Sequence, residues 1–163
     1  MCGSDHGARS GRALAAEWLS GDFTVEGAPD LSEAAGKADI ISCATTAREP
    51  VLGGAWIRPG THVDLIGPCK ADMREADDDL MSRASLFADS RQTTLHHIGE
   101  LMIPLSSGVI AENNVLGDLY DLIPELIEGR KSAEKITVFG NGGGARLDLM
   151  MVNFISKRLQ SEQ

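Results

Sequence analysis

A glycine-rich turn near the end of the sequence is the first feature whose residue types suit ligand chemistry. Residues 135–151 read KITVFGNGGGARLDLMM, and residues 140–145 have the G-x-G-x-x-A spacing of a dinucleotide-binding turn. The apolar residues in 136–139 predict a short buried strand before the turn, and the residues from Leu147 onward predict a helix after it. In a dinucleotide-binding protein, such a turn holds the pyrophosphate at the N-terminus of the helix.

The turn lacks the rest of a dinucleotide fingerprint. A complete fingerprint continues into another strand and carries an acidic residue about 20 positions later, which binds the ribose. Residues 147–163 predict one helix and no further strand. We therefore expect residues 140–144 to serve another purpose than holding a pyrophosphate.

A pair of histidines and a run of aspartates are residue types that can bind a metal ion, but the arrangement of neither group favours a metal site. His96 and His97 are adjacent, so on a helix they would point about 100° apart and not toward one ion. Residues 77–79 are all aspartate, which on a helix is typical of a solvated face paired with Arg74 and Arg83. We expect no metal site.

The composition excludes several classes of partner. The chain has 163 residues, 42% hydrophobic and 24% charged, which is enough for one globular domain with a core. A net charge of -9 argues against nucleic acid, whose backbone attracts clustered Lys and Arg. No apolar run approaches the roughly 18 residues of a membrane span, so we expect no membrane partner and a cytoplasmic location. Cys2, Cys43 and Cys69 have no C-x-x-C spacing, and we expect reduced thiols.

Strands that alternate with helices position these residues. The apolar patterns predict helices over 9–19, 31–37 (with Asp30 as N-cap), 72–83, 90–101, 116–128 and from 147 onward. They predict strands over 22–27, 40–44, 62–66, 85–89 and 136–139, and a loop around 104–114. Short strands separated by helices indicate βαβ units, and therefore a parallel sheet covered by helices.

Ligands of such sheets bind at the carboxyl ends of the strands. Four strand ends are therefore candidate sites: residues 44–46, 66–69, 89–91 and 139–142. Each contains glycine or small hydroxylic residues, which allow a ligand to approach the backbone. Ordinary turns of an α/β domain have the same composition, so both interpretations stay open for each strand end.

Four segments of the sequence resemble the ornithine cyclodeaminase/mu-crystallin family of NAD(P)-binding proteins. The segments are ADIISCATTAREPVLGGAWIRPGTHVDLIG, DMREADDDLMSRA, FADSRQTTLHHIGELMIPLSSGVI and ITVFGNGGGARLDLM, which follow one another in family order over residues 38–150. The resemblance implies an α/β fold: an incomplete Rossmann-like parallel sheet with helices on both faces, ending in a long C-terminal helix. It also implies that residues 1–163 form a partial NAD(P)-binding Rossmann domain, without the family's N-terminal substrate and dimerisation domain and its Gly-rich pyrophosphate turn.

The resemblance assigns roles to individual residues. Thr45 matches a cofactor-contacting threonine at a strand end, although a strand-end cap is the simpler interpretation of its hydroxyl. Val63, Asp64, Leu65 and Ile66 match the strand end that lines the nicotinamide pocket. A carboxylate on a buried strand is costly unless it is hydrogen-bonded, so Asp64 either binds cofactor hydroxyls or anchors a neighbouring loop.

The final turn and Cys69 complete the candidate site. Asn141 matches a position that approaches the cofactor, and Gly142 one that approaches the substrate; Gly140 stands where relatives often have lysine. Cys69 occupies the position of the aspartate that shuttles protons in ornithine cyclodeaminases, and we take it as the candidate catalytic residue. A thiol with an ordinary pKa of about 8.5 is a poor substitute for that carboxylate. A small, semi-buried apolar role for Cys69 is the simpler alternative.

The resemblance implies an enzyme that uses NAD or NADP on a small amino acid or cyclic imino acid. Because Cys69 replaces the aspartate, we expect the reductase branch, in which a Δ1-pyrroline-2-carboxylate-type ketimine accepts hydride from NAD(P)H. Ornithine cyclodeaminase, which converts ornithine to proline and ammonia, is the alternative. A non-catalytic fragment that needs a partner is a further alternative. The complete enzyme is expected to be a homodimer.

Overall fold

The computed structural model describes residues 24–143 and 145–161, in two units divided between Ala38 and Asp39. In the first unit, helix α2 (Leu31–Lys37) begins after Asp30, whose carboxylate accepts hydrogen bonds from the N–H groups of Ser32 at 2.8 Å and Glu33 at 3.1 Å. The predicted helix and its N-cap are confirmed, because an N-cap carboxylate satisfies N–H groups that the first turn leaves unpaired. These hydrogen bonds also lower the pKa of Asp30.

Two further elements were predicted before α2. The helix predicted over 9–19 lies outside the described residues. The strand predicted over 22–27 is wrong for its described part, since residues 24–27 form no strand. Alternating polarity is insufficient for a strand when no neighbouring strand accepts its hydrogen bonds.

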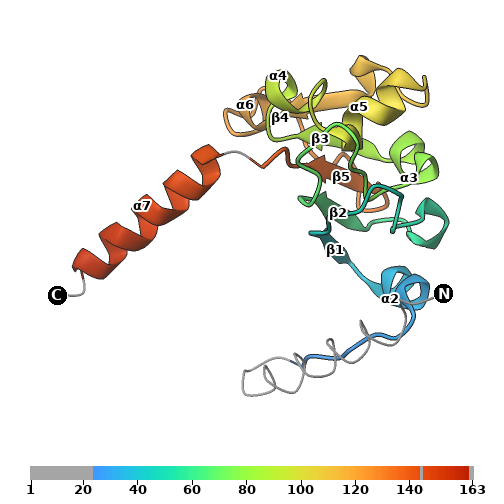
Figure 1. The fold of residues 1–163 in the computed structure, drawn as a ribbon, viewed down its shortest axis with the longest axis horizontal. Helices are drawn as coiled ribbons and strands as arrows, with labels where there is room; N and C mark the ends of the chain where they lie inside the picture. Colours follow the sequence, from blue (N-terminus) through green and yellow to red (C-terminus); the bar gives the residue numbers. More distant parts are fainter. Residues whose placement is uncertain (1–23, 144, 162–163) are drawn as a thin grey trace. The chain divides into compact units, whose positions relative to one another are not determined.

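The second unit contains a five-stranded parallel sheet (Figure 1). Its strands are β1 (Ile40–Cys43), β2 (His62–Leu65), β3 (Ser85–Ala88), β4 (Val115–Asp118) and β5 (Thr137–Gly140). The order across the sheet is β1-β2-β5-β3-β4. The prediction of an α/β fold with a parallel sheet is confirmed, and four of the five strands lie where the apolar patterns predict them.

Apolar side chains of the inner strands form the core. Val63, Leu65, Leu86 and Val138 are each at most 1% exposed. Burial of one such side chain contributes about 1.5–3 kcal/mol relative to leaving it in water. By contrast, Ile40 on edge strand β1 is 71% exposed. The inner strands β2, β5 and β3 therefore anchor the sheet, and they fix where the strand ends lie.

The last strand of the chain lies in the middle of the sheet. Figure 1 shows β5 between β2 and β3, so the turn that follows it leaves the sheet beside two earlier strand ends. The backbone N–H of Asn141 donates to the carbonyl of Leu65 at 2.9 Å, and the N–H of Asp89 donates to the carbonyl of Gly140 at 3.1 Å. These bonds join the ends of β2, β5 and β3 into one edge.

The helix predicted over 72–83 begins later than its pattern indicates. Helix α3 spans Asp78–Arg83, with Asp77 as its N-cap. Residues 75–77 pair with another segment instead: the N–H groups of Val51 and Leu52 both donate to the carbonyl of Glu75, and Leu52 forms a parallel bridge with Ala76. Pairing with residues 51–52 overrides the helical pattern in this segment.

The helix predicted over 90–101 is two helices, α4 (Arg91–Thr94) and α5 (Gly99–Ser106). The chain must break because Gly99 packs directly on backbone: its N–H donates to the carbonyl of Lys70 at 2.9 Å. The loop predicted around 104–114 consequently begins later, since Pro104 lies inside α5, and it contains the short 3₁₀ helix η2 (Glu112–Asn114). A second 3₁₀ helix, η1 (Gly54–Trp56), lies between β1 and β2.

The helix predicted over 116–128 is wrong in its first part. Residues 115–118 form β4, which pairs with β3, and only Leu119–Leu122 form a helix, α6. The carboxylate of Asp118 caps α6 by accepting the N–H of Tyr120 at 2.9 Å. A four-residue strand with one glycine has too short an apolar run to be distinguished from a helix start.

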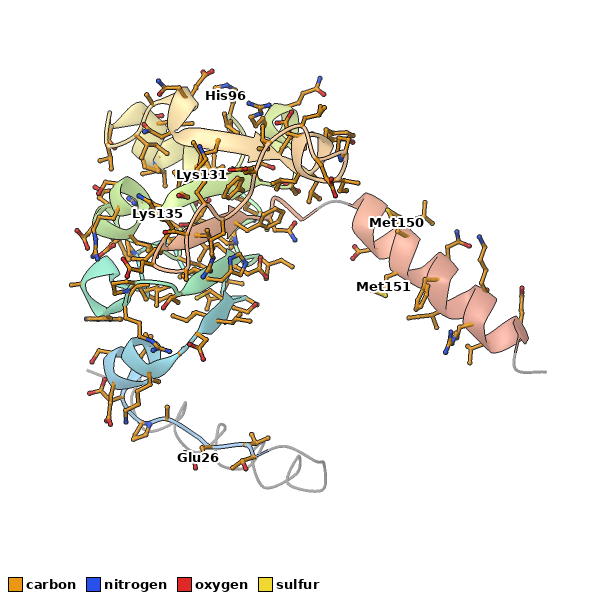
Figure 2. The ribbon with its side chains drawn as sticks, turned by 180° about the vertical axis from the view of Figure 1, so that it is seen from behind. Glu26, His96, Lys131, Lys135, Met150 and Met151 are labelled. Atoms are coloured by element: carbon orange, nitrogen blue, oxygen red, sulfur yellow. The ribbon has the colours of Figure 1, made fainter. Side chains whose placement is uncertain are left out.

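A long helix, α7 (Ala145–Ser161), ends the described chain, as predicted. Figure 2 shows Met150 and Met151 projecting from it, and both side chains are exposed. The other large apolar side chains of α7 that are exposed are Leu149, Val152, Phe154, Ile155 and Leu159. Among the described residues, no helix is both long enough and apolar enough to cross a bilayer.

Because Gly99 packs on backbone at the break between α4 and α5, one added methyl group there should lower the stability of the fold. A Cβ at residue 99 would lie 2.3 Å from the carbonyl oxygen of Met73 and 2.6 Å from that of Ala71, so Gly99→Ala should destabilise the fold by about 1–3 kcal/mol. In the control Gly129→Ala, the new Cβ meets its nearest atom at 3.7 Å. Urea unfolding of both variants measures the difference, and equal midpoints would contradict the packing described here.

Candidate active site

The ends of β1, β2 and β5 leave the sheet at one level. The register pairs Cys43 with Leu65 and Leu65 with Gly140, so residues 44–46, 66–67 and 141–142 follow at the same edge. All four predicted strand ends thus lie along one edge of the sheet, and three of them, after β1, β2 and β5, lie around β2. Parallel sheets bind ligands at this edge.

The fourth strand end is closed by hydrogen bonds within the chain. One carboxylate oxygen of Asp89, after β3, accepts the N–H of Ser90 at 2.7 Å and the hydroxyl of Thr94 at 2.5 Å. At the end of β4, Asp118 accepts the N–H of Arg91 at 2.9 Å, and the Arg91 guanidinium also pairs with Asp121. Polar groups at the ends of β3 and β4 are therefore engaged in local structure, which leaves the β1, β2 and β5 ends as the candidate site.

A buried carboxylate joins two of these ends. Glu75 is fully buried; its Oε1 accepts the N–H of Thr45 at 2.5 Å, and its Oε2 accepts the N–H of Gly67 at 3.2 Å. A Cβ on residue 67 would lie 2.2 Å from the Thr45 carbonyl oxygen and 2.4 Å from Glu75 Oε1. Only glycine allows this approach, so the ends of β1 and β2 meet around the Glu75 carboxylate.

A second buried carboxylate holds the segment that carries Glu75. The two oxygens of Glu100, in the first turn of α5, accept the N–H groups of Glu75 at 2.7 Å and Ala76 at 3.0 Å. Burial raises the pKa of the Glu100 carboxyl to about 7, while these two hydrogen bonds act in the opposite direction. Neither glutamate was predicted, because the helix patterns over 72–83 and 90–101 place neither Glu75 nor Glu100 near a strand end.

Thr45 lies exposed at the end of β1. Its hydroxyl oxygen accepts the N–H of Ala47 at 3.2 Å, so the strand-end cap considered from the sequence does form. A threonine hydroxyl can accept that bond and still donate its own proton. The cofactor contact implied by the family resemblance stays a prediction that is compatible with this geometry.

The side chains of β2 divide between the core and the surface. Val63 and Leu65 are buried in the core, so of the predicted pocket-lining residues these two have side chains that a ligand cannot reach. Asp64 accepts a hydrogen bond from the hydroxyl of Ser42 on β1 at 3.4 Å, which links it to a neighbouring strand rather than to a loop. Ile66 is 41% exposed and is the apolar side chain that β2 presents at its end.

Cys69 is exposed, so the semi-buried role considered from the sequence is wrong. Its sulfur lies 3.8 Å from the sulfur of Met73. The other described cysteine, Cys43, is half-buried on β1, and burial together with the carboxylates of Glu75 and Glu100 raises its pKa to about 11. Cys43 is therefore a neutral thiol at physiological pH, and Cys69 is the accessible one.

The turn after β5 is held by its own backbone. The side-chain oxygen of Asn141 accepts the N–H of Gly143 at 3.0 Å, and Gly143 has a φ of +63°, a conformation that favours glycine. A Cβ on Gly142 would lie 2.6 Å from the Thr94 hydroxyl. Packing on α4 thus requires the glycine at 142; its predicted contact with substrate, like the cofactor contact of Asn141, is not tested by this packing.

The aspartates at 77–79 have structural roles. Asp78 pairs with Arg74 at 2.5 Å and Asp79 with Arg83 at 2.7 Å, as predicted, while Asp77 caps α3. His96 lies 3.5 Å from Glu112, between α4 and α5 rather than within a helix. Among residues 24–143 and 145–161, no group of three or more His, Cys, Asp or Glu side chains is arranged to hold a metal ion.

Comparison with known proteins identifies the family. The profile of the ornithine cyclodeaminase/mu-crystallin family matches residues 7–163, and the chain belongs to this family. The Delta(1)-pyrroline-2-carboxylate reductase of Paracoccus denitrificans is 64% identical over 128 residues, which are 78% of this chain and 40% of that protein. The chain thus spans about two fifths of the length of the curated relatives it matches.

Solved structures agree with the fold. Delta(1)-pyrroline-2-carboxylate reductase of Thermococcus litoralis, in complex with NADH and L-proline, has a TM-score of 0.75 and 32% identity, and the match covers 83% of this chain and 41% of that one. An archaeal alanine dehydrogenase dimer with bound NAD has a TM-score of 0.82 and 25% identity, over 94% of this chain and 47% of that one. The predicted family and Rossmann-like fold are confirmed.

The raised pKa of Glu100 predicts a pH-dependent stability. The folded state keeps the Glu100 proton up to about pH 7, whereas the unfolded state releases it near 4.5, so this group favours folding at low pH. As the pH rises from 4.5 to 7, the free energy of unfolding loses this contribution, which is on the order of 3 kcal/mol in total. Urea unfolding of Glu100→Gln should therefore show a weaker fall of stability across this window than the parent.

A control separates this effect from other titrating groups. Burial and the nearby Arg130 lower the pKa of His62, which makes stability rise with pH, but that contribution is common to both proteins. Glu134→Gln changes an exposed glutamate and should keep the parental pH profile. An unchanged profile in Glu100→Gln would contradict the assignment.

Proposed function

We propose that the protein containing this chain reduces a cyclic imino acid of the Δ1-pyrroline-2-carboxylate type with NADH or NADPH. The observation that carries the proposal is the edge formed by the ends of β1, β2 and β5, which offers a hydroxyl, an apolar side chain and an amide, from Thr45, Ile66 and Asn141. The 64% identity to a Delta(1)-pyrroline-2-carboxylate reductase supports this substrate class.

The hydrogen bonds at this edge suit a nicotinamide better than a pyrophosphate. A pyrophosphate site needs free backbone N–H groups and no adjacent negative charge. Here the N–H groups of Thr45 and Gly67 already donate to the Glu75 carboxylate. The ends of β1 and β2 would therefore hold the nicotinamide and its ribose, and the phosphates would lie elsewhere.

Each residue has a separate task in this proposal. The Thr45 hydroxyl donates to a cofactor oxygen, the exposed Ile66 side chain packs on the ring and keeps water away, and Asn141 orients the cofactor amide. When bound, NAD(P)H supplies a hydride to the imine carbon, and a proton from solvent completes the secondary amine. The chain then contributes mainly orientation and a water-poor surface, which are sources of rate enhancement that need no nucleophile.

Cys69 favours reduction over cyclodeamination. Cyclodeamination requires a group that moves protons at the substrate amine, and the family resemblance assigns this task to an aspartate where this chain has an exposed thiol. Hydride transfer to an imine carbon has no such requirement. Cys69 is thus proposed to lie near the substrate without acting as a base.

We also propose that the complete protein is a homodimer. Two observations support an association: large apolar side chains of α7 are exposed in this chain, and the archaeal alanine dehydrogenase with the same fold is a dimer. Exposed apolar surface of this extent is typical of surfaces that other protein segments cover.

Substitution of Cys69 tests the reaction type. In the natural gene product that contains residues 1–163, reduction of Δ1-pyrroline-2-carboxylate should exceed conversion of ornithine to proline by at least about 100-fold in kcat/KM, the scale of a lost general base. Cys69→Asp should narrow this ratio by restoring a carboxylate, while Cys69→Ser should not. Steady-state assays of both substrates measure the ratio, and efficient proline formation from ornithine with native Cys69 would refute the reductase proposal.

Substitution of Thr45 tests the cofactor contact. Thr45→Val keeps the shape of the side chain but removes the hydroxyl, so KM for NADH or NADPH should rise about 5- to 15-fold, the loss of one hydrogen bond of about 1–1.5 kcal/mol. Thr137→Val, far along the sheet at the start of β5, should leave this KM unchanged. A parental cofactor KM in Thr45→Val would rule out the contact.

A further inference from the structure

We propose that Glu75 is a positioning residue for hydride transfer: its carboxylate sets the spacing between the Thr45 and Gly67 strand ends that would hold the nicotinamide. The inference rests on the proposed function, because it concerns the same site. Its structural part, the joining of two strand ends, stands on the observed hydrogen bonds alone.

The carboxylate is the direct link between these two ends. β1 and β2 pair regularly up to Cys43 and Leu65, and the N–H of Ile66 still donates to the carbonyl of Cys43 at 3.0 Å. Beyond that point Thr45 and Gly67 donate to the two oxygens of Glu75, at 2.5 and 3.2 Å. The Glu75 carboxylate thus continues the pairing past the end of the ladder.

Burial makes this arrangement stiff. Glu75 is fully buried, so its charge is stabilised only while both N–H donors remain in place. The Gly67 backbone packs closely on both oxygens, since its N–H donates to Oε2 and a Cβ on residue 67 would lie 2.4 Å from Oε1. Movement of either strand end would break a hydrogen bond to a buried carboxylate, which costs more than breaking an exposed bond.

The backbone segment that carries the Glu75 carboxylate is itself held by hydrogen bonds. The Glu100 carboxylate binds the N–H groups of Glu75 and Ala76, and the carbonyl of Glu75 accepts the N–H groups of Val51 and Leu52. The backbone of Glu75 therefore makes three hydrogen bonds and the N–H of Ala76 a fourth, while the Glu75 side chain makes two. This position is held firmly enough to define where Thr45 and Gly67 lie.

The consequence for the reaction is a matter of distance. Thr45 donates one of the Glu75 hydrogen bonds, and Ile66 directly precedes Gly67, which donates the other. A change in the spacing between Thr45 and Ile66 would therefore displace a ring held between these two residues. A misplacement of about 1 Å can lower a rate by about 100-fold without abolishing binding. Glu75 variants should thus lose kcat, while cofactor affinity, which depends largely on the phosphates, changes little.

Amide hydrogen exchange tests the structural part in the 163-residue chain. In the parent, the N–H groups of Thr45 and Gly67 should exchange slowly although Thr45 is exposed, because Glu75 accepts both. Unprotected exchange at these two amides in the parent would overturn the proposal without any variant. Glu75→Gln, in which one oxygen becomes an NH₂ donor, should lose protection at one or both amides while the Ile66 amide stays protected.

Kinetics in the natural gene product test the functional part. Glu75→Gln and Glu75→Asp should lower kcat by about 10- to 100-fold with KM for NADH changed less than about threefold, and Gln should be the milder change because it keeps one acceptor at full reach. The kinetic isotope effect with 4-deuterated NADH should rise, since hydride transfer becomes the slow step. Glu134→Gln, an exposed change just before β5 in the segment of Lys131 and Lys135 (Figure 2), should match the parent.

The outcomes separate this inference from the proposed function. If the parent reduces the imine and Glu75→Gln loses amide protection but keeps the parental kcat and isotope effect, the positioning role is refuted. A lower yield of folded enzyme with an unchanged isotope effect would likewise refute the positioning role, because Glu75 would then only stabilise the fold. If the parent protects both amides but reduces no cyclic imine, the strand-end link stands and the proposed function fails.

Discussion

The hydrogen bonds that the buried Glu75 carboxylate accepts from Thr45 and Gly67 are the constraint on which the candidate site depends. A fully buried carboxylate is tolerated only when donors surround it, so the ends of β1 and β2 must converge on it. Their convergence in turn requires glycine at 67 and consumes N–H groups that a phosphate would otherwise use. What remains for a ligand is the Thr45 hydroxyl, the Ile66 side chain and the Asn141 amide, which suit the ring-binding surface that we propose.

The order of the strands places the turn after β5 at the same surface. Because β5 inserts between β2 and β3, the glycine-rich turn lies beside the end of β2, and the Asn141 N–H is fixed by the Leu65 carbonyl. Two glycines of this turn have a structural explanation: Gly142 allows contact with Thr94, and Gly143 adopts a positive φ. The glycine at 142 serves here to bring a strand end against helix α4.

Much of the fold was predictable because the strands β1, β2, β3 and β5 have strong apolar patterns and Asp30 is a typical N-cap. Strand β4 was not, since residues 115–118 are too short and contain Gly117. The candidate site was predictable in part: Thr45, Ile66 and Asn141 follow strands whose ends had to meet. Glu75 and Glu100 were missed, because their role depends on the pairing of residues 51–52 with residues 75–77, and no local pattern in D-M-R-E-A-D indicates that long-range pairing.

A crystal structure of the natural gene product with NADH and L-proline bound would show whether the strand ends joined by Glu75 hold the nicotinamide. We expect the nicotinamide ring at the ends of β1, β2 and β5, with Thr45 in hydrogen-bond contact with the cofactor, Ile66 against the ring, and Glu75 still accepting both backbone N–H groups. A nicotinamide bound at the Asp89 and Asp118 ends of β3 and β4, or a Glu75 carboxylate turned away from Thr45 and Gly67, would contradict this expectation.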